Sequence, residues 1–180
     1  EELGRAAASR IGCEYVHLDL CSEDSIHAAA AAVRQKHGGI DALVNNAGFA
    51  FKASSSTPFR QQARPTLQVN FFGTLAVTEA FLPLLRPGGQ VVNVASSSGH
   101  LSIIKSPVLR GKFESSGELG GLDMMGLKKL MEEFVESVED GSHQAVGWPN
   151  SCYGVSKLGV IAMTRILAAE QRERGITVTA

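Results

Sequence analysis

Tyr153 and Lys157 are the two side chains whose types and spacing could do chemistry together. If a helix passes through Tyr153-Gly154-Val155-Ser156-Lys157, residues four apart share one face, and the phenol and the ammonium can enter the same pocket. A phenol is a poor acid–base group at neutral pH, but a fixed cation beside it favours the phenolate. Such a pair could give a proton to a carbonyl oxygen or take one from an alcohol. A surface lysine beside a half-buried tyrosine has the same spacing, so the pair needs support from the rest of the chain.

The elements that must position this pair alternate between strand and helix patterns. Ser22 is suited to cap a helix that runs to about His37, and Pro65 suits the first turn of a helix that continues through Asn70 to Leu85. A further helix is expected over Tyr153–Arg174, with Gly175 as its cap. Strand patterns occupy Glu14–Leu20, Ile40–Val44 and Gln90–Ala95, and another begins at Ile176. This alternation predicts an α/β fold, a doubly wound parallel sheet with helices on both faces.

Polar residues fall at the carboxyl ends of the expected strands. Asp19, Asn46 and Ser96 each stand where a strand pattern ends. Ligands of parallel α/β sheets bind beyond these ends, so the three residues mark one candidate site.

Residues 100–150 interrupt the alternation. A glycine-rich stretch is followed by apolar residues at helical spacing: Leu127, Leu130, Phe134 and Val138. We therefore expect one partial domain over residues 1–180, with an inserted excursion at about 100–150 that contains an amphipathic helix.

Composition excludes several classes of function. The net charge is −1, the charged share is 19%, and no basic stripe suggests nucleic acid. No uninterrupted apolar run approaches the ~20 residues of a membrane span. Cys13, Cys21 and Cys152 are too scattered for a disulfide framework, and the five histidines lack ligand spacing, so we expect no metal site. Reduced cysteines indicate a cytoplasmic protein.

With Asn45-Asn46-Ala47-Gly48, Asn70, Ser96 and Tyr153-Gly154-Val155-Ser156-Lys157 in that order, the chain resembles the short-chain dehydrogenase/reductases. It is most similar to their carbonyl reductases, including the plant salutaridine and menthone reductase type. The closer likeness lies in residues 46–52, residues 70–74, Gly147-Trp148-Pro149 and the long excursion. The resemblance implies a Rossmann-like sheet and NADPH-dependent reduction of a ketone or aldehyde, a small-molecule carbonyl substrate.

The resemblance also implies roles for single residues. Tyr153 would protonate the substrate oxygen as hydride arrives from the nicotinamide, and Lys157 would favour its phenolate and hold the nicotinamide ribose. Ser96 would hydrogen-bond the carbonyl oxygen, and Asn70 would hold a water that relays protons to Lys157. The cofactor would be lined by Tyr153, Lys157 and five further residues: Asp19, Leu20, Asn46, Ala47 and Gly48.

The chain departs from the family pattern at its start. No Thr-Gly-x-x-x-Gly-x-Gly turn precedes Asp19, so we expect the first βαβ unit and the region of the last strand to be missing and the chain to be cut at both ends. The choice between NADPH and NADH stays open.

Many relatives dimerise through helices beside the catalytic site, and the excursion could cover that surface, so we expect a monomer. Two alternatives remain: a truncated, inactive relative serving as an interaction module or inert fragment, and a nucleotide-sugar epimerase, which shares the Tyr/Lys pair.

Overall fold

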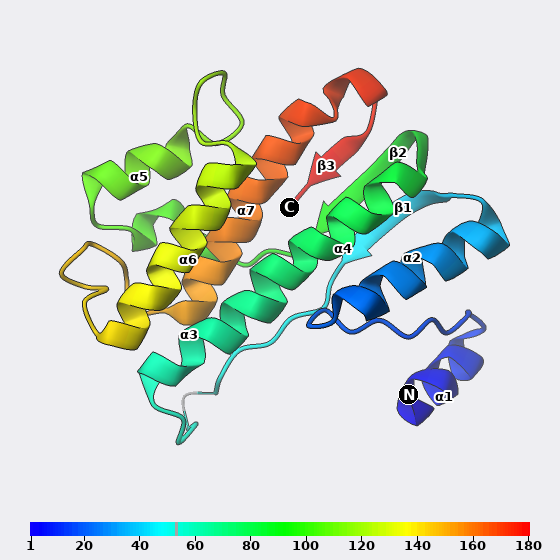
Figure 1. Ribbon diagram of the computed structural model, residues 1–180, viewed down its shortest axis with the longest axis horizontal. Coiled ribbons are helices and arrows are strands. Elements are labelled where there is room, and N and C mark those ends of the chain that lie inside the picture. Colours follow the sequence, from blue (N-terminus) through cyan, green and yellow to red (C-terminus); the bar gives the residue numbers. More distant parts are fainter. Residues whose placement is uncertain (53) are drawn as a thin grey trace.

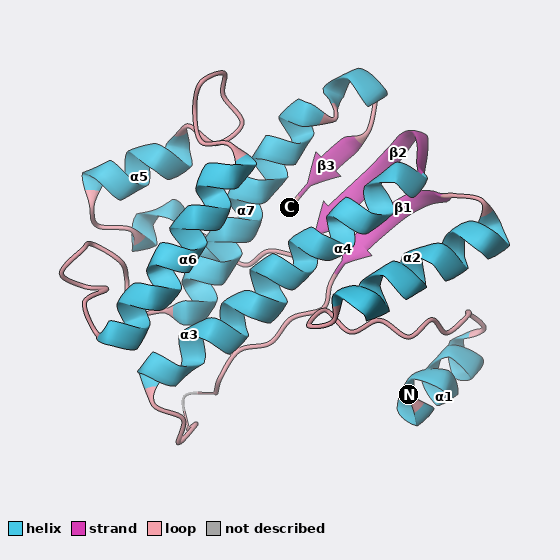
Figure 2. Cartoon of the chain, in the orientation of Figure 1, coloured by secondary structure: helices cyan, strands magenta, loops and turns pink. Residues whose placement is uncertain are grey.

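The computed structural model describes residues 1–52 and 54–180. Its helices and its strands alternate over much of the chain (Figures 1 and 2). The α-helices are α1 (Glu2–Ile11), α2 (Glu23–His37), α3 (Phe59–Leu67), α4 (Thr74–Phe81), α5 (Pro107–Glu114), α6 (Met124–Asp140) and α7 (Cys152–Glu170), and the strands are β1 (Ile40–Asn45), β2 (Leu85–Asn93) and β3 (Thr177–Thr179). Short helical turns are η1 (Gln68–Gly73), η2 (Leu82–Leu84), η3 (Ser97–Gly99), η4 (Leu101–Ile103) and η5 (Arg172–Arg174).

The three strands form one parallel sheet in the order β1-β2-β3. Val91 of β2 stands between Leu43 of β1 and Val178 of β3 in the register. This confirms the parallel α/β sheet and three of the four expected strands. β2 starts earlier than expected, and its register with β1 is irregular between Ile40 and Ala42.

Helices cover only one face of this sheet among the described residues. α4 packs on β1, and α7 packs on β2 and β3. Both helices belong to crossovers that step in the same direction across the sheet, and right-handed crossovers of that kind place their helices on one face. Val91 and Val178 are buried on the covered face, whereas Val44 is 59% exposed. The described part of this Rossmann-like sheet therefore carries helices on one face, because its strand order never reverses.

The expected strand over Glu14–Leu20 is also absent. These residues run as an unpaired extended segment between α1 and α2 (Figure 1). Glu14 pairs with Lys36 and His37 of α2, and Arg5 of α1 lies over the Tyr15 ring, 5.0 Å from its centroid. The pattern suited a strand, but no described strand lies beside it, so the backbone has no ladder to join.

Helix α2 begins and ends where its predicted capping residues stand. The Ser22 hydroxyl accepts a hydrogen bond from the Ser25 N–H, and Gly38 closes the helix with φ 70°. The prediction for Pro65 is wrong: α3 begins at Phe59, and Pro65 lies inside it. Proline has no N–H for the helical ladder, and the π-helical turn η1 follows directly.

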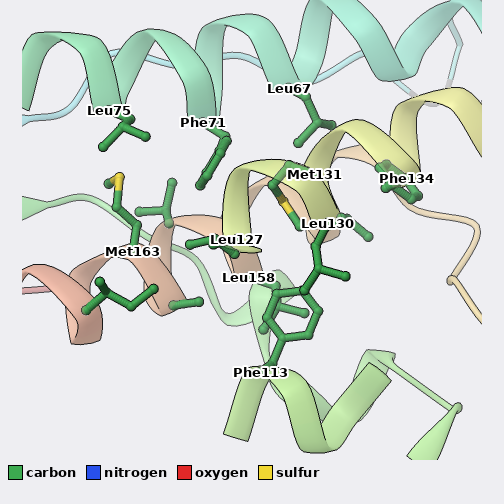
Figure 3. Packing of buried hydrophobic residues seen from close by; sticks show 14 of the residues in the cluster. Leu67, Phe71, Leu75, Phe113, Leu127, Leu130, Met131, Phe134, Leu158 and Met163 are labelled. Atoms are coloured by element: carbon green, nitrogen blue, oxygen red, sulfur yellow. The ribbon is translucent and has the colours of Figure 1, made fainter. Parts of the chain in front are cut away.

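The core lies between three helical layers (Figure 3). Leu67, Phe71 and Leu75 project from α3, η1 and α4 toward Leu158 and Met163 of α7. The apolar stripe of α6 fills the remaining side, and its four predicted residues, Leu127, Leu130, Phe134 and Val138, are all buried. This confirms the amphipathic helix of the 100–150 segment, which also holds the unexpected helix α5.

Two helical stretches are long and apolar enough to cross a membrane by length and composition alone, Phe59–Leu84 and Cys152–Glu170. Within their most apolar windows, 50% and 72% of the residues are buried inside the fold. Core burial accounts for their apolar character.

Candidate active site

Helix α7 positions the tyrosine and lysine that the sequence singled out. The Ser151 hydroxyl caps the helix by accepting a hydrogen bond from the Gly154 N–H at 3.0 Å. One turn later, Lys157 Nζ lies 5.8 Å from the centroid of the Tyr153 ring. The predicted shared face is confirmed. Tyr153 is half-buried, and its hydroxyl makes no hydrogen bond within the described residues.

The Lys157 ammonium is buried beside the end of β2. Its Nζ donates a hydrogen bond to the Val94 carbonyl at 2.6 Å, and within the described residues no carboxylate pairs with it. Burial lowers the pKa of Lys157, because the charged form loses its hydration. One of its three N–H donors is used by Val94, which leaves two for a ligand with hydroxyl groups.

Asn70 lies in the π-helical turn η1 and is buried. Its Oδ1 accepts from the Phe49 N–H at 2.9 Å, while its Nδ2 donates to the Phe49 carbonyl at 2.8 Å and to Ser156 Oγ at 3.1 Å. Both amide hydrogens are thus used. The water that the family resemblance assigns to Asn70 would have to bind one of its oxygen atoms, and this role stays a prediction. π-helical turns are frequent at functional sites.

The loop after β1 passes directly over Asn70 and Lys157. A Cβ on Gly48 would lie 3.0 Å from Asn70 Oδ1 and 3.8 Å from Lys157 Nζ. A side chain at residue 48 would therefore enter the space beside the ammonium. Asn46 and Ala47 precede it on the exposed surface at the carboxyl edge of the sheet.

Ser96 lies in the loop that follows β2, and this loop rests against α7. Its hydroxyl accepts a hydrogen bond from the Ser98 N–H at 3.2 Å and caps η3, so its own hydrogen stays available to donate. A Cβ on Gly99 would lie 2.7 Å from the Lys157 carbonyl carbon. The structure thus brings the Ser96 loop to the same helix turns as Tyr153 and Lys157.

Asp19 and Leu20 are further from this cluster. Asp19 is exposed, and its carboxylate accepts a hydrogen bond from the Cys21 N–H at 2.9 Å in the turn before α2. This is the ordinary turn-forming role of an aspartate. Leu20 lies against Gly73, whose added Cβ would meet the Leu20 carbonyl oxygen. Leu20 thus contacts the end of the turn that carries Asn70.

Sequence reasoning missed two polar features behind the site. Ser156 is fully buried, accepts from Asn70 and donates to the Tyr153 carbonyl at 2.8 Å. Asn45 Nδ2 donates to Thr78 and to Asn93, and Asn93 in turn donates to Thr164 of α7 at 2.9 Å. A polar residue inside an apolar strand, as Asn93 is in β2, was the available signal. These bonds tie β1, β2, α4 and α7 together beneath the site.

The neighbouring thiol and the acidic groups offer no second chemistry. Burial raises the pKa of Cys152 to about 12, so its thiol stays protonated and inert at neutral pH. In the part of the chain that the structure describes, no group of histidine, cysteine, aspartate and glutamate residues is arranged to hold a metal ion.

The fold and site define an α/β protein of the Rossmann-like class, with a tyrosine, a buried lysine and a buried asparagine at the carboxyl edge of its sheet. A family profile described as enoyl-(acyl carrier protein) reductase matches residues 1–109. Carbonyl reductase (NADPH) 1 of Bos taurus is 41% identical over 180 residues, covering 97% of this chain. The chain belongs to the short-chain dehydrogenase/reductase family.

Solved structures show the same fold. Salutaridine reductase from Papaver somniferum superimposes with a TM-score of 0.84 at 21% identity, covering 97% of this chain and 72% of that one. Menthone neomenthol reductase from Mentha piperita superimposes with a TM-score of 0.74 at 28% identity, covering 85% and 65%. The chain spans 64% of the length of the bovine carbonyl reductase.

Proposed function

We propose that this chain is the central part of an NADPH-dependent short-chain carbonyl reductase, with Tyr153 as the proton donor to a ketone or aldehyde. The observation that carries the proposal is the placement of the buried Lys157 ammonium 5.8 Å from the Tyr153 ring, with the Asn70 carboxamide beside it beneath Gly48. Similarity at 41% identity to a carbonyl reductase supports this choice of substrate class.

Four residues of the chain have separate roles in the proposed reaction. Tyr153 holds its hydroxyl toward the substrate oxygen and gives up the proton. Lys157 places positive charge near the phenol, which favours the phenolate left behind. The Ser96 hydroxyl donates a hydrogen bond to the same carbonyl oxygen, where negative charge develops. Asn70 fixes the Phe49 backbone against α7 through Ser156, and so keeps the loop over Lys157 in place.

The described residues fit one half of NADPH better than the other. When bound, the cofactor would supply the hydride. Lys157 has two free N–H donors beside Gly48, which has no side chain to fill the space, and these donors suit the ribose hydroxyls. The rest of the cofactor would be lined by residues of the loop after β1 and of the turn before α2: Asn46, Ala47, Asp19 and Leu20. Among the described residues, the N-terminus of α1 does not suit the pyrophosphate, because its N-cap is Glu1 and its first turn holds Glu2, and these carboxylates repel an anion.

The competing proposal is an inactive relative that serves as an interaction module or persists as an inert fragment. The 64% coverage of the bovine relative and the open sheet face favour it for the 180 residues alone. We expect these residues by themselves neither to bind NADPH measurably nor to turn over. A chimera that carries the flanking segments of the bovine carbonyl reductase on both sides of residues 1–180, here called the extended chimera, should do both.

Calorimetric titration of NADPH separates these cases. The extended chimera should bind NADPH with a dissociation constant on the order of 1–10 μM and reduce a ketone, whereas the 180-residue chain should give no heat of binding. Micromolar binding by the 180-residue chain would show that it builds its own pyrophosphate site. An extended chimera that folds and binds NADPH but reduces no ketone or aldehyde would contradict the carbonyl reductase proposal.

Three further properties belong to this proposal. The partner is a small carbonyl compound rather than nucleic acid or a membrane. The cytoplasm is the proposed compartment, since Cys13, Cys21 and Cys152 are free thiols, as a reducing environment maintains. The protein is a monomer, and residues 1–180 are one partial domain with α5 and α6 in the excursion at about 100–150.

A further inference from the structure

A small hollow lies behind the Ser96 loop, between η4, α5 and α7, and it is separate from the Tyr153–Lys157 pair. Its volume is about 140 Å³. Its walls are mostly apolar, and the buried side chains of Phe113, Leu158 and Ala162 form part of them, together with the half-buried Leu101 and Ile161. An apolar cavity of about 150 Å³ in another protein is large enough to hold benzene. This hollow therefore has the size and the surface for one aromatic ring.

The Arg165 guanidinium gives the lining of the hollow a permanent positive charge. Its two ionisable residues are His100 and Arg165, both exposed, and no carboxylate lines it. Four other hollows, at α1, α4, α6 and the 117–123 loop, each have at least one glutamate in their lining. Within the described residues, the Arg165 guanidinium forms neither an ion pair nor a hydrogen bond. His100 uses Nδ1 toward Ser102 at 3.0 Å, which leaves Nε2 available.

We propose that this hollow binds a small aromatic monocarboxylate of the size of benzoate. The ring would lie among Phe113, Leu158 and Ala162, and the carboxylate would face Arg165, whose planar fork matches the two carboxylate oxygens. His100 supplies a second donor on the same side. A ligand with the aromatic ring but no carboxylate would not pair with the guanidinium. An acid without the ring would leave the apolar walls exposed to water.

The occupied hollow would join the catalytic loop to the catalytic helix. Gly99 and Leu158 both line it. Gly99 lies three residues after Ser96, and Leu158 is the residue after Lys157. The inference does not depend on the proposed reductase activity, because its ligand contacts neither Tyr153 nor Lys157.

The test is a titration of the extended chimera with benzoate at neutral pH, followed by nuclear magnetic resonance of the methyl groups. About nine ligand atoms at ordinary efficiency predict a dissociation constant on the order of 1 mM. The resonances of Leu101, Leu158 and Ile161 should shift together along one binding curve. Benzyl alcohol, which keeps the ring and lacks the charge, should bind about tenfold more weakly.

Arg165→Met is the decisive variant, since it keeps the apolar stem of an exposed side chain and removes the charge. It should weaken benzoate binding about tenfold and leave benzyl alcohol unchanged. Arg172→Met is the matched control: this exposed arginine follows α7 but does not line the hollow, and benzoate affinity should not change. No shift at these methyl groups up to about 20 mM benzoate, or equal losses in the two variants, would overturn the proposal.

Discussion

The Asn70 carboxamide donates a hydrogen bond to the Ser156 hydroxyl at 3.1 Å, and this bond joins the π-helical turn to the helix of Tyr153. Ser156 passes the connection on by donating to the Tyr153 carbonyl. Both residues are buried, so neither can exchange its partner for water. The pair thus sets how the Phe49 loop, η1 and α7 meet at the candidate active site.

Removing either side of this bond should destabilise the extended chimera. Asn70→Ala leaves both Phe49 backbone groups without their partner and should lower the free energy of unfolding by about 2 kcal/mol, and Ser156→Ala by about 1 kcal/mol. Because the two residues share one bond, the double variant should lose less than the sum of the two losses. Urea denaturation of the four proteins measures this, and strictly additive losses would show that the bond contributes nothing.

The burial of Lys157 predicts how the stability of the protein changes with pH. Burial depresses the pKa of Lys157 below its ordinary value of 10.5, so between the folded-state pKa and 10.5 the unfolded chain binds more protons than the folded one. Stability contributed by this group should therefore rise with pH across that window. Relative to Lys157→Met, the wild-type extended chimera should gain stability as the pH is raised from 7 toward 10.5.

The measurement is urea denaturation of both proteins at several pH values. The difference between them isolates Lys157, because every other titrating group is common to the two. A difference that stays constant, or that falls as the pH rises, would mean that Lys157 is better hydrated or better paired than its contact with Val94 indicates.

Helix α6 should keep the protein monomeric. It packs against α3 and α7, its apolar stripe is buried there, and the bidentate Arg64–Glu139 pair, with contacts of 2.7 and 2.8 Å, fixes its outer edge. The surface of α7 beside the candidate active site is thus covered by the chain itself. Sedimentation velocity of the extended chimera should show a single monomeric species at micromolar concentration. A stable dimer would show that α6 leaves a usable interface.

The sequence predicted the elements that local rules govern. Ser22 and Gly38 bound α2 as capping residues should, and the stripe from Leu127 to Val138 identified α6. Tyr153 and Lys157 share a face because helical geometry places residues four apart together. These features depend on neighbours in the chain, so no knowledge of the tertiary structure was needed.

The predictions that failed concern features that depend on residues far away in the sequence. The Glu14–Leu20 pattern suited a strand, but a strand exists only beside another, and α1 and α2 flank this segment instead. The sequence predicts a helix start at Pro65, yet α3 begins about 1.7 turns earlier, at Phe59. Ser156 was overlooked because its role follows from η1 packing on α7, a contact between residues 86 positions apart.

The proton-donor role of Tyr153 is the central claim, and Tyr153→Phe in the extended chimera tests it most directly. Tyr15→Phe is the matched control, since Tyr15 is the other tyrosine of the chain and lies beside α1. We predict that Tyr153→Phe lowers kcat for ketone reduction about 10²–10⁴-fold while the NADPH dissociation constant changes less than about threefold. Tyr15→Phe should retain both values. Near-normal turnover in Tyr153→Phe would contradict the assignment.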